Sequence, residues 1–407
     1  MSATPAAPPR SPGHRPPLRV VLLNWRDSGH PEGGGSELYV ESVAAGLARR
    51  GHDVTLLTAR YPGSSATERR DGYRVLRAGG RLTVYPRALL RLVTGRAGSF
   101  DVVVDVQNGV PFWARLVTRR PVVVLCHHVH REQWGIAFSH SAAGRVAARL
   151  GWWLESRAAP RVQRGCRYVT VSEVSRQDLA ALGVRADDVR VVHNGTPGAT
   201  QAGPRSAVPE VVVLGRLVPH KRVEHAVRAV AALAPELPGL RLTVVGQGWW
   251  ESELREEVER LGVGDRVDLV GWVSDQDKQR ILSRAWVMAV PSVKEGWGLC
   301  VVEAAAHGTP SVAYHDAGGL SESVVDGVTG LLCHGTDAFT DALRRLLVQP
   351  ALRAQMGTAA VGHAACFTWD ATTEAFAAVL DEAAGGPRRL PADRLTASGR
   401  DRDTTAA

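Results

Sequence analysis

Lysine is almost absent from this chain, and long apolar runs are missing altogether. Only three of its 49 basic residues are lysines, Lys221, Lys278 and Lys294, so each one stands out against a background of arginine. No apolar stretch reaches the roughly 18 residues that a membrane-spanning helix needs, and the amino terminus lacks the apolar segment of a secretory signal. The sequence therefore predicts no membrane span and a cytoplasmic location.

Cysteine is scarce and scattered. The five cysteines form no CxxC pair, which disfavours both a disulfide framework and a structural zinc site. We expect them to be small core residues of a protein in a reducing compartment. They are Cys126, Cys166, Cys300, Cys333 and Cys366.

The net charge is basic but does not indicate a nucleic-acid partner. The formal net charge is +8, yet the arginines are scattered and aromatic residues are not interleaved with them. Part of the charge lies in the polar ends, 1–17 and 385–407, which their composition predicts to be disordered. We therefore expect no nucleic-acid binding.

Length and hydrophobic pattern predict two domains. A chain of 407 residues with 44% hydrophobic residues exceeds one ordinary core. Continuously apolar runs alternate with helix-length segments, which is typical of parallel strands covered on both faces. We predict an α/β protein with two tandem Rossmann-like, doubly wound sheets. Its parts are a first domain over 18–195, a linker over 196–209, a second domain over 210–363, and a helix over 364–384 that crosses back to the first domain.

The apolar runs give the predicted strands. They lie at 18–23, 54–58, 102–105, 122–126, 168–171 and 189–192 in the first domain, and at 211–214, 240–245, 267–270, 286–290, 311–313 and 330–333 in the second.

The most informative stretch runs from Glu295 to Glu303 and places two carboxylates around a glycine-rich turn. The apolar run before it predicts a strand and Leu299–His307 predicts a helix, so Glu295 lies on a loop and Glu303 in a helix. Amide groups at a helix start favour anions, and a nearby carboxylate can accept hydrogen bonds from a polyol. The pair suggests a nucleotide sugar, although a solvated, capped helix start is the alternative.

A glycine run, Gly33–Gly35, follows the first predicted strand. Glycines at a helix start allow close approach of the backbone to a ligand, whereas a flexible connection is the alternative interpretation. Because open α/β sheets bind ligands at the carboxyl ends of their strands, the position favours a binding role. Neither GxGxxG nor GxxxxGK[ST] is present, which argues against a nicotinamide-dependent oxidoreductase.

His127 follows the strand predicted over 122–126. Two further histidines lie close in sequence, but no obvious carboxylate partner accompanies them, so we expect a hydrogen-bonding histidine and no metal site.

The second domain opens with Arg216 and Lys221 directly after its first predicted strand. A forked guanidinium and a point charge at a helix start form a clamp suited to a diphosphate, although two solvated basic residues would look the same. Gly246 and Val273 occupy later strand-end turns, where a base and ribose could lie.

With these motifs, residues 18–383 resemble the retaining glycosyltransferases of family four, which have the GT-B fold. The resemblance implies that Gly34 and Gly35 approach the donor phosphates and the acceptor. It implies that Arg216 and Lys221 hold the diphosphate and that Glu295 binds hydroxyl groups of the donor sugar.

The same resemblance assigns the other site residues. It implies that Glu303 binds the ribose, that the amides of Gly298 and Leu299 meet the sugar and phosphate, and that His127 lies near the transferred sugar. Trp297 stands where the family often has phenylalanine, which leaves the amide positions intact.

The activity that the resemblance implies is transfer of a hexosyl unit, with retained configuration, from a UDP- or GDP-sugar to a glycan, lipid-linked or small-molecule acceptor. The first domain shows no obvious second nucleophilic carboxylate, so we expect a front-face route in which the leaving diphosphate takes the acceptor proton. The basic clamp can replace a metal, so we expect no cofactor and no essential metal. The alternatives are an epimerase or a phosphorylase of the same fold, and less favoured a non-enzymatic binding protein.

Residues 85–96 have an amphipathic pattern. Leu89, Leu92 and Val93 can share one helix face framed by arginines, as in helices that rest on anionic lipid, whereas a surface helix of the first domain is the alternative. Lipid contact would make the protein peripheral at the inner face of the membrane and would favour a lipid-linked acceptor.

Overall fold

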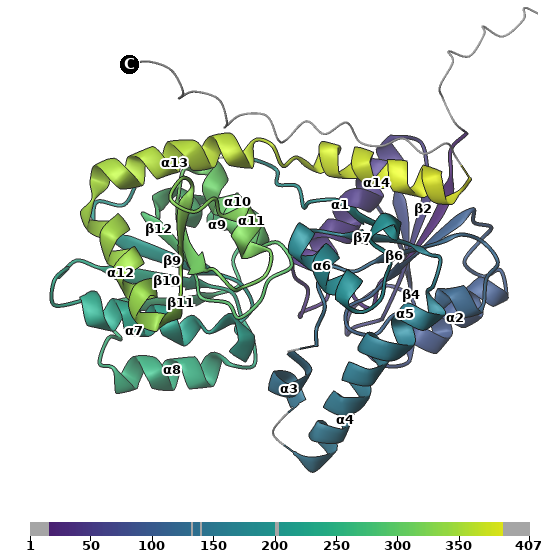
Figure 1. The fold of residues 1–407 in the computed structure, drawn as a ribbon, viewed down its shortest axis with the longest axis horizontal. Helices are drawn as coiled ribbons and strands as arrows, with labels where there is room; N and C mark the ends of the chain where they lie inside the picture. Colours follow the sequence, from purple (N-terminus) through teal and green to yellow (C-terminus); the bar gives the residue numbers. More distant parts are fainter. Residues whose placement is uncertain (1–15, 132, 139–140, 200–202, 386–407) are drawn as a thin grey trace, which may run out of the picture.

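The computed structural model describes residues 16–131, 133–138, 141–199 and 203–385, and shows two α/β domains side by side (Figure 1). Each domain is built on one largely or wholly parallel sheet, so the predicted pair of doubly wound sheets is confirmed. The two predicted tails lie almost wholly outside the described residues, as does the middle of the predicted linker.

The first domain contains an eight-stranded sheet in the order β3-β4-β2-β1-β5-β6-β7-β8. Its strands are β1 (Arg19–Leu23), β2 (Asp53–Thr58), β3 (Thr67–Arg70), β4 (Tyr73–Arg77), β5 (Val102–Val106), β6 (Val122–Leu125), β7 (Arg167–Thr170) and β8 (Val189–Val191). The connections contain α1 (Gly35–Arg49), α2 (Val84–Val93), η1 (Ala114–Leu116), α3 (Gln133–Phe138), α4 (Ala142–Trp153), the π-helical turn η2 (Leu154–Ala158), α5 (Ala159–Val162), α6 (Glu173–Ala181) and η3 (Ala186–Asp188).

Both faces of this sheet are covered, which explains why its strands are continuously apolar. Val20 and Leu22 of β1 belong to one core cluster, whereas Val21 and Leu23 belong to another on the opposite face. Successive side chains of a strand point to opposite faces, so a strand with helices on both sides needs apolar residues throughout.

The hairpin of β3 and β4 was not among the predicted strands. It forms the edge of the sheet and is antiparallel, with Arg70 paired to Tyr73 across a two-residue turn. Asp71 and Gly72 of that turn have φ of 47° and 87°, which is the geometry that Asp-Gly favours in tight hairpins. An edge strand rich in charge has no continuous apolar run, so the search for such runs passed over it.

The second domain contains a six-stranded parallel sheet in the order β11-β10-β9-β12-β13-β14. Its strands are β9 (Glu210–Leu214), β10 (Arg241–Val245), β11 (Val267–Gly271), β12 (Val287–Val290), β13 (Ser311–Tyr314) and β14 (Gly330–Cys333). The helices are η4 (Pro219–Lys221), α7 (Val223–Leu233), α8 (Glu251–Arg260), α9 (Asp275–Arg284), α10 (Leu299–Ala306), α11 (Leu320–Ser323), α12 (Gly335–Val348), α13 (Pro350–Ala364) and α14 (Trp369–Ala383).

The last helix, α14, returns to the first domain and packs against α1 (Figure 1). Phe376 of α14 is fully buried and faces Tyr39 of α1, with ring centroids 6.3 Å apart. The two helices meet closely because Gly46 has no side chain. A Cβ atom at that position would lie 2.3 Å from the Thr373 Oγ1 atom.

The helix within 85–96 is α2, whose Leu92 is buried in the first domain and whose Leu89 packs partly against the same core, whereas Val93 is exposed. This packing fits the alternative of a surface helix of the first domain, and contact with lipid stays a prediction. One prediction about exposure was wrong, because Cys366 is exposed and is not a core residue. No helix in the described part of the chain is long and apolar enough to cross a membrane.

The contact of α1 with α14 makes Gly46 sensitive to substitution. We expect Gly46→Ala to lower the free energy of unfolding by about 1–3 kcal/mol, because the new methyl group overlaps Thr373 in a packed interface. Gly362→Ala is the matched control, since no atom would lie within 4 Å of its new Cβ. That variant should be neutral or more stable by up to about 1 kcal/mol, because alanine favours helix. Denaturant unfolding measures both, and equal effects would contradict the proposed close packing.

Candidate functional site

The site lies between the domains, where loops at the carboxyl ends of the two sheets meet. A Cβ atom on Gly34 would lie 3.7 Å from the Arg216 Nε atom, and one on Gly35 would lie 3.7 Å from the Leu299 Cδ2 atom. A Cβ atom on Gly296 would lie 2.5 Å from the His127 carbonyl oxygen, so the two backbones are in close contact. The glycine loop, the strand-end histidine and the turn before α10 are therefore in one place.

Glu295 lies on the loop between β12 and α10, and both its side chain and its backbone are hydrogen-bonded. Its carboxylate accepts hydrogen bonds from the Lys221 ammonium and from the Ser292 hydroxyl, the latter at 2.7 Å. Its backbone pairs with the following loop, through Glu295 N–H to the Ala317 carbonyl at 3.0 Å and Gly319 N–H to the Glu295 carbonyl at 2.9 Å. The orientation of this carboxylate is fixed by these contacts before any ligand binds.

Glu295 is an ionised carboxylate in this setting. Burial raises its pKa, but the charge of Lys221 and the hydrogen bonds from Lys221 and Ser292 outweigh burial, so the pKa lies below its ordinary value. A carboxylate of this kind only accepts hydrogen bonds, which suits it to bind hydroxyl groups.

The start of α10 presents free backbone amides to the same space. Gly298 precedes the helix with φ of 84°, a conformation that residues with a side chain rarely adopt. A Cβ atom there would also lie 2.4 Å from the Leu320 Cδ2 atom. Glycine thus lets the chain turn into Leu299 and leaves the first amides of the helix without helical partners, a favourable place for an anion.

Glu303 lies one turn into α10 and is paired with Lys278 of α9. The Lys278 Nζ atom lies 2.8 Å from Glu303 Oε1, and the Glu303 side chain is only 6% exposed. Burial raises the pKa of Glu303, and the charge of Lys278 limits the rise. Burial lowers the pKa of Lys278, but Glu303 and Asp275 more than offset this, so its pKa lies above its ordinary value.

Positive charge gathers on both sides of the glycine loop. Arg216 is exposed, and no carboxylate of the residues described lies at ion-pair distance from it. Arg26 is buried beside Glu37, with the Arg26 Nε atom 3.3 Å from Glu37 Oε1. Burial and the nearby charge of Arg216 both lower the pKa of Arg26. Arg26 is already paired with Glu37 and Glu32, so Arg216 is the guanidinium of this pair that is left to bind an anion.

Glu37 was not among the predicted site residues. Its carboxylate accepts the Gly34 N–H at 2.7 Å and is fully buried, so it fixes the glycine loop at the start of α1. A glutamate at the third position of a helix is a known capping signal, and Gly34 to Glu37 has that spacing.

His127 is a buried, neutral histidine. Burial, with a further effect from His130, lowers its pKa to about 3. Its ring lies edge-on to Tyr39, at 5.1 Å between centroids, and its Nε2 atom is buried without a hydrogen-bond partner. A buried polar atom without a partner in the protein needs an explanation, and a hydrogen bond to a ligand is one such explanation.

The other two predicted donor-site positions follow β10 and the edge strand β11 of the second sheet. Gly246, after β10, lies so close to Gly215 after β9 that a Cβ atom would be 1.9 Å from the Gly215 carbonyl oxygen. The turn at Gly246 therefore packs directly against the loop that carries Arg216. Val273 follows the edge strand β11 and packs partly against the core of the second domain.

Two further residues hold the domains together at this site. The Glu322 carboxylate accepts N–H groups of Glu173 and Val174 at the start of α6, at 2.9 and 2.7 Å. Lys294 pairs with Asp178 of α6 at 2.8 Å. The scarcity of lysine, which drew attention to Lys221, could have identified Lys278 and Lys294 as well, whereas Glu322 has no distinctive signal in the sequence.

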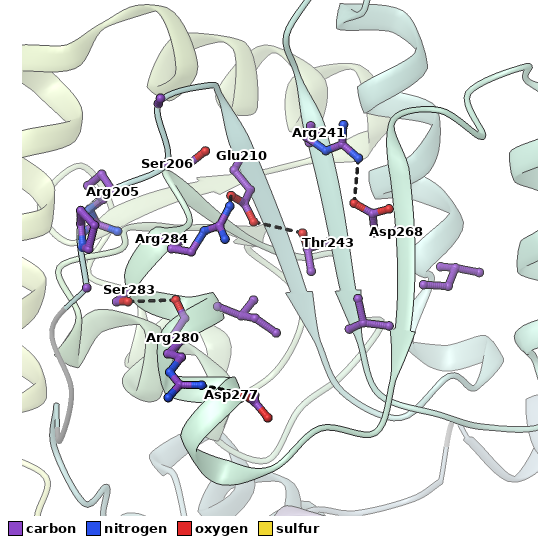
Figure 2. Close-up of a pocket in the computed structure, with 16 residues that line it drawn as sticks. Arg205, Ser206, Glu210, Arg241, Thr243, Asp268, Asp277, Arg280, Ser283 and Arg284 are labelled. Atoms are coloured by element: carbon purple, nitrogen blue, oxygen red, sulfur yellow. Dashed lines mark hydrogen bonds and ion pairs between the residues drawn. The ribbon is translucent and has the colours of Figure 1, made fainter.

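A separate hollow of about 970 Å³ opens in the second domain, away from the site just described (Figure 2). It is bordered by residues 203–207, β10, β11 and α9. None of the predicted site residues lines it. Six of its charged side chains are paired among themselves, including Arg241 3.0 Å from Asp268 and Arg280 3.0 Å from Asp277. The lining has four arginines and three carboxylates, and Arg205 bonds to backbone carbonyls instead of a carboxylate. The hollow therefore carries only a small excess of positive charge.

Comparison with known proteins relates both halves of the chain to glycosyltransferases. Residues 33–197 match the family described as Glycosyltransferase Family 4, and residues 201–362 match Glycosyl transferases group 1. The chain is 32% identical to the D-inositol 3-phosphate glycosyltransferase of Actinosynnema mirum, over 90% of this chain and 97% of that protein. It is 30% identical to the protein of the same name from Corynebacterium diphtheriae, over 90% and 95%.

Solved structures show the same fold at lower identity. Sucrose-phosphate synthase from Thermosynechococcus elongatus has 22% identity and a TM-score of 0.76, over 90% of this chain and 98% of that one. The Anabaena protein HepE, solved with UDP-glucose, has 19% identity and a TM-score of 0.72, over 90% and 100%.

The contribution of the Lys278–Glu303 ion pair to stability can be tested by its pH dependence. We expect Lys278→Met to lower the free energy of unfolding by about 2–4 kcal/mol at pH 7, because it leaves a buried carboxylate uncompensated. The loss of Lys278 raises the folded pKa of Glu303 further above its unfolded value. The destabilisation should therefore be small below about pH 4.5 and grow as the pH rises. Urea unfolding between pH 4.5 and 8 measures it.

The control is the double variant Lys278→Met/Glu303→Gln. It removes the buried charge, so part of the stability should return and the extra pH dependence should disappear. A stability difference that stays constant over the whole pH range in Lys278→Met would show that the pair is not electrostatically coupled.

Proposed function

Because the chain belongs to glycosyltransferase family 4 and has the GT-B fold, we propose that it transfers a hexosyl unit from a nucleoside-diphosphate sugar to a hydroxyl group of an acceptor. The observation that carries the proposal is the meeting of Arg216, the Lys221–Glu295 pair and the start of α10 opposite Gly34 and Gly35. This arrangement provides cations and amides for a diphosphate beside a carboxylate for a sugar.

A uridine nucleotide is the first candidate for the donor. The structural neighbour HepE was solved with UDP and with UDP-glucose, and its chain superposes over 90% of this one. Glu303 would bind the ribose hydroxyls, held in place by Lys278. Gly246 and Val273, at the ends of β10 and β11, would border the base. GDP-sugars remain the second candidate.

The transfer proceeds with retained configuration in our proposal. The bond between the anomeric carbon and the diphosphate oxygen breaks, and Arg216, Lys221 and the amides of Gly298 and Leu299 stabilise the charge on the leaving diphosphate. The acceptor hydroxyl attacks from the same face and passes its proton to that diphosphate. Glu37 of the first domain is fully buried and already bonded to Gly34 and Arg26, so it is not available as a nucleophile.

Glu295 and His127 position the transferred sugar. The ionised Glu295 accepts hydrogen bonds from sugar hydroxyls, and the unpartnered Nε2 atom of His127 makes one more contact from the first domain. Because the pKa of His127 is lowered to about 3, the ring stays neutral and does not compete with the clamp for the diphosphate.

The acceptor would lie against the first domain, near the glycine loop. Relatives at about 30% identity are named for D-inositol 3-phosphate, a small polyol phosphate. We propose a polyhydroxylated acceptor of this kind or a glycan, with the hydroxyl that attacks directed between Gly34 and His127. A lipid-linked acceptor is compatible with the same cleft.

Replacing Glu295 tests the assignment of the sugar contact. We expect Glu295→Ala to reduce transfer by more than about 100-fold, because the sugar loses its orienting carboxylate. Binding of the free nucleoside diphosphate should be nearly unchanged. A thermal-shift series with UDP-, GDP- and ADP-sugars first identifies the donor, since a ligand at 100 times its Kd stabilises the fold by about 2.7 kcal/mol.

Glu259→Ala, at an exposed position of α8, is the control for removal of a carboxylate and should transfer normally. If Glu295→Ala turns over like the wild type, the proposed role of Glu295 is wrong. If no nucleotide sugar shifts the unfolding temperature, the proposed donor class is wrong.

Metal independence is a further expected property, because Arg216, Lys221 and helix amides supply the positive charge that a metal would otherwise provide. Transfer measured with excess EDTA should equal transfer measured with added Mg²⁺ or Mn²⁺. A loss of most activity in EDTA, with recovery on adding Mg²⁺, would contradict this mechanism.

A further inference from the structure

Two histidines and an aspartate meet on the surface of the second domain, at the carboxyl ends of β13 and β14. His315 directly follows β13 and His334 directly follows β14. The strands are parallel neighbours, with Tyr314 paired to Cys333, and the His315 N–H donates to the Cys333 carbonyl at 3.0 Å. The sheet therefore places the two imidazoles side by side, with centroids 4.9 Å apart.

Asp316 lies between the two rings. The Nδ1 atom of His315 lies 3.1 Å from Asp316 Oδ1, and the Nδ1 atom of His334 lies 3.1 Å from Asp316 Oδ2. In a tetrahedral zinc site with bonds of about 2.0–2.1 Å, neighbouring ligand atoms are about 3.3 Å apart. Both nitrogen-to-oxygen separations are close to that value, and the three ligand atoms lie within 4.8 Å of one another.

The chemistry of the three ligands selects the kind of ion. Two imidazoles and one carboxylate suit Zn²⁺ and its neighbours Co²⁺ and Ni²⁺, whereas Mg²⁺ and Ca²⁺ prefer oxygen ligands. The side chains of His315, Asp316 and His334 are 54%, 79% and 67% exposed, so solvent can supply the remaining ligands. Within the described residues this is the one group whose spacing would hold an ion.

We propose that His315, Asp316 and His334 form a surface site for a Zn²⁺ ion, separate from the transfer site. The site is connected to Glu295 by a short path. Asp316 precedes Ala317, whose carbonyl accepts the Glu295 N–H, and Gly319 donates to the Glu295 carbonyl. An ion that fixes Asp316 against the ends of β13 and β14 therefore stabilises the loop that supports Glu295 from behind.

The test measures binding directly, on the full chain without a histidine tag and after removal of metal by a chelator. Titration calorimetry with ZnCl₂ should show one Zn²⁺ per chain. Co²⁺ should give visible absorbance bands of a nitrogen- and oxygen-bound ion, and Zn²⁺ should raise the unfolding temperature while Mg²⁺ does not. His334→Ala and Asp316→Asn should each weaken zinc binding by about tenfold or more.

His52→Gln, in the first domain, removes one imidazole away from the proposed site and should bind Zn²⁺ like the wild type. The proposal is overturned if zinc produces neither heat nor a thermal shift, or if His334→Ala binds zinc as tightly as the wild type does. Both readouts are independent of transfer activity, so they test the metal site whether or not the proposed donor is correct.

Discussion

Carboxylates that are withdrawn from water need a compensating positive charge, and this constraint organises the site. Lys221 pairs with Glu295, and Lys278 pairs with Glu303. The third lysine, Lys294, pairs with the partly exposed Asp178 of the first domain. An isolated charge away from water costs several kcal/mol, so Glu295 and Glu303 each need the lysine that lies within hydrogen-bonding distance. The first two pairs lie on the donor side, and the third connects the two domains.

The domains also approach each other closely at two glycines, which lie apart from the ion pairs. Gly296 contacts the His127 carbonyl, and Gly195 lies so close to the start of α14 that a Cβ atom would be 2.4 Å from the Trp369 backbone nitrogen. At that point the chain passes between the domains twice, and Thr196 pairs with Thr368 in a short parallel bridge. The rings of His193 and Trp297, tilted by 32° with centroids 4.4 Å apart, pack together beside the crossing. The turn before α10, through Gly296 and Trp297, therefore contacts both the first domain and the segment that leads into the crossing.

Much of this arrangement could be predicted from sequence because the signals were local. Continuous apolar runs gave the parallel strands, and the spacing of Glu295 and Glu303 correctly placed one on a loop and the other in α10. The edge hairpin of β3 and β4 escaped because charged residues interrupt its apolar ones, although Tyr73, Val75 and Leu76 of β4 are buried in the core. Glu322 could not be found, since its role depends on meeting α6 about 150 residues away along the chain. The sequence left open whether Leu92 faces lipid or the core of the first domain, because periodicity identifies an apolar stripe but does not say what covers it.

The two carboxylates of the central turn differ in a way that their spacing does not reveal. Glu295 is stabilised as a carboxylate by a lysine and a serine, and its pKa lies below the ordinary value. Glu303 sits deeper in α10 with one lysine, and its pKa lies above it. In the proposed complex, Glu295 keeps Lys221 and Ser292 as partners and accepts hydrogen bonds from sugar hydroxyls as well. Glu303 depends on Lys278 to keep the charge that would let it accept from two ribose hydroxyls. In the proposed ribose contact, Lys278 of α9 thus decides whether Glu303 of α10 can act as an acceptor, so this contact depends on both helices.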